Sequence, residues 1–140
     1  MDALELKYTV SRDDFARAGE ASGSLKKTLK TLGFSPDLVR RVAIAMYEAE
    51  INMVIHAQGG EITATVTPEE LVIVFADVGP GIPDISLAMT AGFSTATDDV
   101  RDMGFGAGMG LPNIKKYADD LEIQTQVGVG TTVTMRFQIA

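Results

Sequence analysis

The sequence contains no cysteine, no tryptophan and a single histidine, His56. A chain without cysteine forms no disulfide, thiolate zinc site or cysteine nucleophile, and one histidine is too few for a histidine-rich metal site. Any metal is therefore expected to bind to oxygen ligands. The chain also lacks an apolar run of the roughly 20 residues that a membrane-spanning helix needs, and its start, MDALELKYTV, is unlike a signal peptide. We expect a cytoplasmic protein with no membrane partner.

Positive charge is scarce, because 12 lysines and arginines face 19 acidic residues and give a net charge of -7. This charge opposes a nucleic-acid backbone, so we expect no nucleic-acid partner. The N-terminal third is nevertheless locally basic, with Lys26, Lys27, Lys30, Arg40 and Arg41. A length of 140 residues, 46% hydrophobic and 22% charged, indicates one globular domain over residues 1–140.

Five stretches have the patterns of β-strands. Four of them alternate apolar and polar side chains, as in strands with one covered face: residues 4–10, 62–66, 121–127 and 133–139. The fifth, residues 71–76, is apolar throughout, which is typical of a central strand.

Three stretches are predicted to be helical. The first covers about residues 13–32. The second, about residues 36–57, begins with Ser35 as its N-cap and Pro36 in its first turn. The third is short and covers residues 111–118.

Residues 78–110 are rich in glycine and contain one short helical candidate, residues 85–91. Loops of this length in a compact domain are usually functional, and we predict a lid over about residues 82–110. The resulting order, β-α-α-β-β-loop-α-β-β, predicts an α+β fold. We expect a two-layer α/β sandwich whose mixed, mostly antiparallel sheet carries the helices on one face and water on the other.

A carboxylate and an amide, Glu48 and Asn52, lie one turn apart on the second predicted helix. At 100° per residue both lie along the edge of its apolar stripe. Polar groups among apolar neighbours are costly without partners, and magnesium and a phosphate-bound water are suitable partners. The alternative is that both are simply solvated, and the helix alone does not decide. Glu50 lies on another side and is expected to be solvated.

Asp77 ends the apolar strand and precedes Val78-Gly79-Pro80-Gly81, so its carboxylate lies where the backbone turns sharply. The two glycines allow close approach of a planar ligand, and a buried aspartate accepts a hydrogen bond from an exocyclic amine. The alternative is an ordinary turn, because aspartate, glycine and proline are the commonest turn residues.

A second glycine-rich segment, Gly104 to Gly110, leads directly into the third predicted helix. Backbone N–H groups and the positive helix end can converge there on phosphate oxygens. The segment lacks the Lys-Ser/Thr ending of a Walker loop and the preceding strand of a dinucleotide fingerprint. A hinge is compatible with the same residues.

A third segment, Gly128-Val129-Gly130-Thr131, has the composition of a hairpin turn. By strand parity Thr131 shares the covered face with Val133, so its hydroxyl needs a polar partner.

In this order the four motifs resemble the N, G1, G2 and G3 boxes of the GHKL, or Bergerat-fold, superfamily of gyrase, the ninety-kilodalton heat-shock chaperone, histidine kinases and MutL. The motifs are Glu48-x-x-x-Asn52, Asp77-x-Gly79-x-Gly81, Gly106-x-Gly108-x-Gly110 and Gly128-x-Gly130-Thr131. The resemblance spans about residues 36–139. VGPGIPD, AGFST, GMGLPNIKKYADDLEI and GVGTTV look closest to the anti-sigma-factor serine/threonine kinases of the RsbT, RsbW and SpoIIAB type.

The resemblance implies a Bergerat ATP-binding fold that uses ATP and Mg²⁺. In the family pattern Glu48 would be the general base, Asn52 would ligate magnesium and Asp77 would read the adenine amine. Thr131 would assist through a water, and the segment from Gly106 to Gly110 would close over the phosphates. The implied cofactor-binding set is Asn52, Asp77, Gly79, Gly81, Gly106, Gly108, Gly110 and Thr131.

By the same resemblance the chain is a serine/threonine protein kinase that phosphorylates a STAS-type anti-sigma-factor antagonist in a partner-switching pathway. The alternative is a nucleotide-gated binding module that sequesters a sigma factor or another regulator without significant turnover. Glu48 favours catalysis, because a clamp has less need of a base. The catalytic half of a histidine kinase has less support, because no helix hairpin with a phosphoacceptor histidine precedes the motifs.

One stretch departs from the family pattern. Residues 97–102, TDDVRD, look inserted, and their three carboxylates would repel ATP phosphates unless the loop swings outward. The sequence leaves open how this stretch affects activity, which partner and upstream signal act on the protein, and whether it forms a homodimer.

Overall fold

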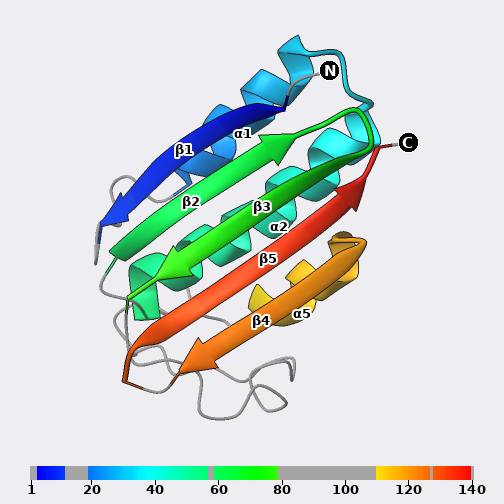
Figure 1. Cartoon of the computed structure of the whole chain (residues 1–140). Helices are drawn as coiled ribbons and strands as arrows, with labels where there is room; N and C mark the ends of the chain where they lie inside the picture. Colours follow the sequence, from blue (N-terminus) through cyan, green and yellow to red (C-terminus); the bar gives the residue numbers. More distant parts are fainter. Residues whose placement is uncertain (1–2, 12–18, 57–58, 79–109, 127, 140) are drawn as a thin grey trace, which may run out of the picture.

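A computed structural model of the chain describes residues 3–11, 19–56, 59–78, 110–126 and 128–139. Five strands in these residues form one sheet (Figure 1): β1 (Leu4–Ser11), β2 (Gly59–Val66), β3 (Glu70–Asp77), β4 (Asp120–Gln126) and β5 (Gly130–Gln138). Their order across the sheet is β1-β2-β3-β5-β4, and every neighbouring pair is antiparallel. The apolar strand β3 therefore lies in the middle, as its sequence predicts.

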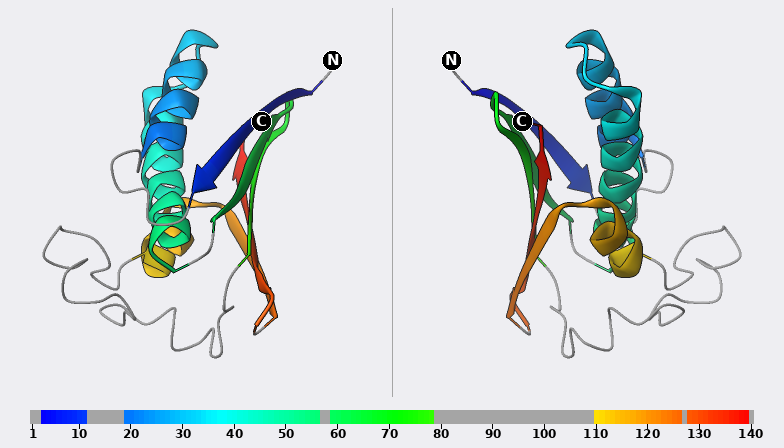
Figure 2. Two further views of the ribbon diagram at one scale, coloured as in Figure 1. Left: turned by 90° about the vertical axis from the view of Figure 1, so that its left-hand side faces the viewer. Right: turned by 90° about the vertical axis from the view of Figure 1, so that its right-hand side faces the viewer.

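The described helices all pack on one face of this sheet (Figure 2). They are α1 (Glu20–Thr31), α2 (Pro36–His56) and α5 (Gly110–Tyr117). The long helix α2 contacts α1 on one side and α5 on the other. The C-terminal ends of α2 and β3 lie at the same edge of the two layers (Figure 1).

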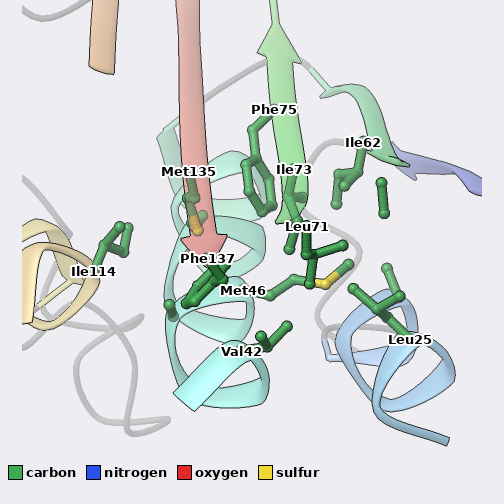
Figure 3. Close-up of a cluster of buried hydrophobic side chains, with 14 of the residues drawn as sticks. Leu25, Val42, Met46, Ile62, Leu71, Ile73, Phe75, Ile114, Met135 and Phe137 are labelled. Atoms are coloured by element: carbon green, nitrogen blue, oxygen red, sulfur yellow. The ribbon is translucent and has the colours of Figure 1, made fainter. Parts of the chain in front are cut away.

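Strand parity determines which side chains enter the core. On β3, Leu71, Ile73 and Phe75 are buried, whereas Val72 and Val74 on the opposite face are only half-buried. Figure 3 shows the side chains that meet them from the other elements: Leu25, Val42, Met46, Ile62, Ile114, Met135 and Phe137. Removing this apolar surface from water is the main force that holds the helices on the sheet.

Polar side chains set where α2 begins. Ser35 Oγ accepts a hydrogen bond from the Leu38 N–H at 3.2 Å, so Ser35 is the N-cap of α2, as predicted. Asp37 adds a negative charge in the first turn, where the helix dipole favours it. Gly33, between α1 and α2, has φ 87°, a left-handed conformation that glycine adopts without strain. The connection between the two helices is therefore encoded locally.

The α+β prediction, with helices on one face of the sheet, is confirmed. The described strands contain only antiparallel pairs, where we expected a mixed, mostly antiparallel sheet. Helix α1 begins at Glu20, later than the predicted start near residue 13, and residues 12–18 lie outside the described residues. The helical candidate at residues 85–91 and the predicted lid, apart from Gly110, lie outside them as well. None of the described helices combines the length and the apolar character needed to cross a membrane.

Candidate functional site

Asp77, the last residue of β3, is held by the start of β5. Its Oδ1 accepts a hydrogen bond of 2.9 Å from the backbone N–H of Thr131. Within the part of the chain that the structure describes, Oδ2 receives no such donor. Burial raises the pKa of Asp77 above its ordinary value, and the hydrogen bond from Thr131 opposes part of that shift. Asp77 is thus fixed in direction while keeping capacity to accept a further hydrogen bond.

Glycines on both neighbouring strands allow the backbone to approach Asp77 closely. A Cβ at Gly60 on β2 would overlap the Ala76 carbonyl oxygen and lie 2.8 Å from the Asp77 Cα. A Cβ at Gly130 on β5 would overlap the Asp77 carbonyl oxygen and lie 3.3 Å from Oδ1. Gly130 is therefore required by packing as well as by the turn. The role of Gly60 was not predicted from the sequence, and its signal is the place of Gly60 opposite Asp77 in the antiparallel register.

Thr131 lies on the covered face of the sheet, as strand parity predicts. It is 6% exposed, and its Oγ1 lies 2.9 Å from Oγ1 of Thr125 on the adjacent strand β4. The predicted need for a polar partner is thus met by a threonine across the strand pair. Thr131 contributes its backbone to Asp77 and its side chain to β4, so it ties β3, β4 and β5 together at this edge.

The last turns of α2 pack against the same edge. A Cβ at Gly60 would lie 2.6 Å from Cε of Met53, so this part of α2 lies directly against β2, opposite Asp77. Glu48 is half-buried one turn before Asn52. The backbone of Asn52 belongs to α2, and its side chain lies outside what the structure describes. The N-box helix and the G1 aspartate thus belong to one edge of the fold.

Glu50 was expected from the sequence to be solvated, and that prediction is wrong. It is only 3% exposed, and its carboxylate accepts hydrogen bonds from Ala21 and Ser22 at the start of α1. A helix position that faces solvent in isolation becomes buried when a second helix packs on it. The available signal was the apolar spacing of Met46 and Met53, which lie four residues before and three residues after Glu50 on the same side of α2.

The remaining predicted site residues are glycines. Gly110 is the first residue of α5, so the G2 segment does lead directly into a helix. Gly79, Gly81, Gly106 and Gly108 lie outside the described residues. Among the described side chains, no three acidic, histidine or cysteine groups gather as they would around a metal held by protein alone.

Comparisons with known proteins agree with this architecture. Residues 12–137 match the family model described as "Histidine kinase-like ATPase domain". Among solved structures, the RsbU and RsbW domains of a Mycobacterium tuberculosis protein superpose with a TM-score of 0.59 at 14% identity, covering 98% of this chain and 32% of that one. The mycobacterial sensor histidine kinase MprB superposes with a TM-score of 0.56 at 16% identity, covering 96% and 97%. At these identities the solved structures support the fold alone.

Two relatives are similar in sequence. The serine/threonine-protein kinase RsbT of Bacillus subtilis is 33% identical over 112 residues, which are 77% of this chain and 78% of RsbT. An anti-sigma F factor of Clostridium acetobutylicum is 30% identical over 146 aligned positions, covering 98% of this chain and 94% of that protein. The family match spans nearly the whole chain, and the fold agrees with it. This chain therefore belongs to the histidine kinase-like ATPase domain family, as the four motifs predict.

Proposed function

We propose that this chain is an ATP-dependent serine/threonine protein kinase of the partner-switching type. The observation that carries the proposal is the Asp77 carboxylate, fixed by the Thr131 N–H at the end of the middle strand and beside the helix of Glu48 and Asn52. The similarity to a protein named as a serine/threonine-protein kinase supports the activity.

In this proposal the adenine ring binds against the edge formed by β2, β3 and β5. The exocyclic amine of adenine donates to the Asp77 carboxylate, whose Oδ1 is already oriented by Thr131. Gly79 and Gly81 allow the planar base to approach the backbone, and Thr131 assists through a water. Asp77 therefore provides the selectivity for an amino-substituted base.

The phosphates are proposed to bind at the start of α5. Gly110 begins this helix, and the helix end contributes free N–H groups and a positive potential. Gly106 and Gly108, which precede it, would let the chain close over the phosphate oxygens. This arrangement requires no lysine at the phosphates.

We propose that magnesium binds to α2. Mg²⁺ typically takes one or two protein oxygens and completes its shell with phosphate oxygens and water. The amide of Asn52 is the proposed protein ligand, so no cluster of several carboxylates is needed. When bound, the ion neutralises charge on the transferred phosphoryl group.

Glu48 is the proposed general base. A serine or threonine hydroxyl of the protein partner attacks the γ-phosphorus, its oxygen forms the new P–O bond, and its proton passes to the Glu48 carboxylate. The bond from the γ-phosphorus to the β–γ bridging oxygen breaks, and ADP leaves with that oxygen. Positioning and charge stabilisation supply most of the acceleration, and the base adds to it.

The proposed partner is a STAS-type anti-sigma-factor antagonist, and the alternative partner is a sigma factor. The relative named as an anti-sigma F factor supports a partner in sigma-factor control. We include a cytoplasmic site of action in the proposal, because ATP and sigma factors are found there. The module without turnover is not favoured, since a similar chain is named as a kinase.

The test is phosphate transfer from labelled Mg-ATP to STAS-type antagonist domains, with wild type, Glu48→Ala and Asn52→Ala compared. Glu48→Ala is expected to retain ATP but to transfer phosphate about 100- to 10,000-fold more slowly, the usual contribution of a general base. Asn52→Ala is expected to lose magnesium-dependent ATP affinity. Equal transfer by Glu48→Ala would remove the assigned base, and tight sigma-factor binding without transfer to any antagonist would contradict the kinase.

A further inference from the structure

Glu50 is a buried carboxylate for which the proposed chemistry has no use. Its Oε2 accepts the Ala21 N–H at 3.1 Å, and its Oε1 accepts the Ser22 N–H at 3.0 Å. Both donors belong to the first turn of α1, where backbone N–H groups have no partner within the helix. The positive end of a helix also favours a carboxylate. Glu50 therefore caps α1 from a neighbouring helix, across 28 to 29 residues of sequence.

A second contact joins the same two places. Gly19, which precedes α1, has φ 90°, and a Cβ there would lie 2.9 Å from Cε1 and 3.2 Å from Cδ1 of the Tyr47 ring. Any larger residue would have to displace that ring. Burial, followed by the charges of Glu48 and Glu50, raises the pKa of Tyr47, so Tyr47 lies close enough to both carboxylates to be affected by their charge.

The two contacts flank Glu48 in sequence. At about 100° per residue, Tyr47 and Glu50 lie within about 60° of each other around α2, while Glu48 lies on the other side, about 100° from Tyr47 and about 160° from Glu50. Helix α1 therefore holds one face of the turn whose other face carries the proposed base. Helices in a close-packed interior transmit such constraints, because packing leaves little room for rotation.

We propose that Glu50 is a positioning residue for phosphoryl transfer: by capping α1 it holds the turn that carries Glu48 in the geometry that accepts the hydroxyl proton. This inference rests on the proposed function of Glu48. A misplacement of about 1 Å in a reacting group can lower a rate about 100-fold. Nucleotide affinity depends on Asn52 through magnesium but also on Asp77 and the glycine segments, which Glu50 does not hold, so loss of the cap affects transfer more than ATP binding.

The test variant is Glu50→Gln, which keeps the shape but turns an amide NH₂ group toward one of the two N–H donors. Glu69→Gln is the matched control, because Glu69 is exposed in the turn between β2 and β3. Single-turnover transfer to a STAS-type antagonist and ATP affinity are measured at a temperature at which all variants are folded. Glu50→Gln is expected to transfer about 10- to 100-fold more slowly, with ATP affinity within about twofold and Glu69→Gln unchanged. The proposal is overturned if Glu50→Gln transfers phosphate at the wild-type rate, or if its ATP affinity falls by the same factor as its transfer rate.

Gly19→Ala provides a second variant if Glu50→Gln does not fold. It disturbs the same junction from the side of α1, through the Tyr47 ring and the left-handed backbone, and leaves the Glu50 carboxylate in place. The same selective slowing of transfer is expected. Unchanged transfer by a folded Gly19→Ala also overturns the proposal.

A structural readout separates this inference from the proposed function. If wild type transfers phosphate to no antagonist, the kinase proposal has failed, and nuclear magnetic resonance then decides the role of Glu50. In Glu50→Gln, faster amide exchange at Ala21 and Ser22 and a shifted carboxyl carbon resonance of Glu48 are expected, with neither change in Glu69→Gln. An unchanged Glu48 resonance contradicts the positioning role, whatever the kinase assay gives.

Discussion

Glu50 and Asp77 are both carboxylates withdrawn from water, but the protein satisfies them differently. Glu50 is almost fully buried, and each of its oxygens accepts a backbone N–H. Asp77 is half-buried, accepts one N–H on Oδ1, and has a pKa raised by burial. The first carboxylate has its hydrogen bonds supplied by α1, and the second retains accepting capacity at the edge of the sheet.

The contrast separates structural from ligand-binding groups on physical grounds. A buried carboxylate whose acceptors are filled by backbone donors contributes to stability and position. A carboxylate that is fixed but incompletely bonded is suited to accept a donor from a ligand. Substitutions at the two residues should therefore affect different measurements.

The largest expected effect on stability is at Glu50. Glu50→Ala leaves the Ala21 and Ser22 N–H groups without their acceptor, and we expect the free energy of unfolding to fall by about 3 kcal/mol. Urea denaturation of Glu50→Ala and of the exposed control Glu69→Ala measures the difference. Glu69→Ala is expected to stay within about 0.5 kcal/mol of wild type. If Glu50→Ala lowers the free energy of unfolding no more than Glu69→Ala does, the contrast between Glu50 and Asp77 is removed.

Gly130→Ala tests the close approach of β5 to Asp77. The new Cβ overlaps the Asp77 carbonyl oxygen, so the strands must separate, and the free energy of unfolding should fall by about 2 kcal/mol. Gly23→Ala is the control, because a Cβ there meets nothing within 4 Å and the residue lies within α1. Helix propensity predicts that the control is unchanged or more stable in the same denaturation assay.

Asp77→Asn should affect ligand binding more than folding. Asparagine is nearly isosteric and its amide oxygen still accepts the Thr131 N–H, so stability should change little. The remaining group is then an NH₂ donor, which faces the adenine amine, and ATP should bind about 10- to 100-fold more weakly. Calorimetric titration with Mg-ATP provides the affinity. Wild-type affinity in Asp77→Asn would mean that its carboxylate does not contact the base.

The smallest effect is the pH dependence of Asp77 itself. Its pKa is raised in the folded state above the ordinary value of 3.8, so the folded protein binds more protons than the unfolded chain just above that pH. Stability from this group is therefore greatest at low pH and is lost as pH rises through the raised pKa. The free energy of unfolding, measured by denaturation between about pH 4 and pH 7, should decrease for wild type relative to Asp77→Asn as the pH rises. Parallel curves would indicate that burial does not perturb this carboxyl group.

The sequence predicts most of the fold because its signals are local. Period-two alternation marks residues 4–10 and 133–139, and Ser35 with Pro36 marks the start of α2; both strands and the helix start appear in the structure. The position of Asp77 at the end of the middle strand was also predictable, because it follows an apolar run and precedes two glycines and a proline.

Contacts between distant segments were not predictable in the same way. The bond from Thr131 to Asp77 joins residues 54 positions apart, and Glu50 meets α1 only because two helices pack antiparallel. Gly60 faces Asp77 only once the register of β2 and β3 is set. These features depend on tertiary packing, which single-sequence periodicity does not encode.

The most direct measurement of the central claim compares the binding of Mg-ATP and Mg-ITP to the wild-type chain by calorimetry. Inosine carries a carbonyl oxygen where adenine carries its amine, and an oxygen facing the Asp77 carboxylate cannot donate to it. ATP is expected to bind at least about 100-fold more tightly than ITP, since the site is left with an unpaired polar group. Equal affinity for the two nucleotides, or no heat on adding Mg-ATP, would contradict the account.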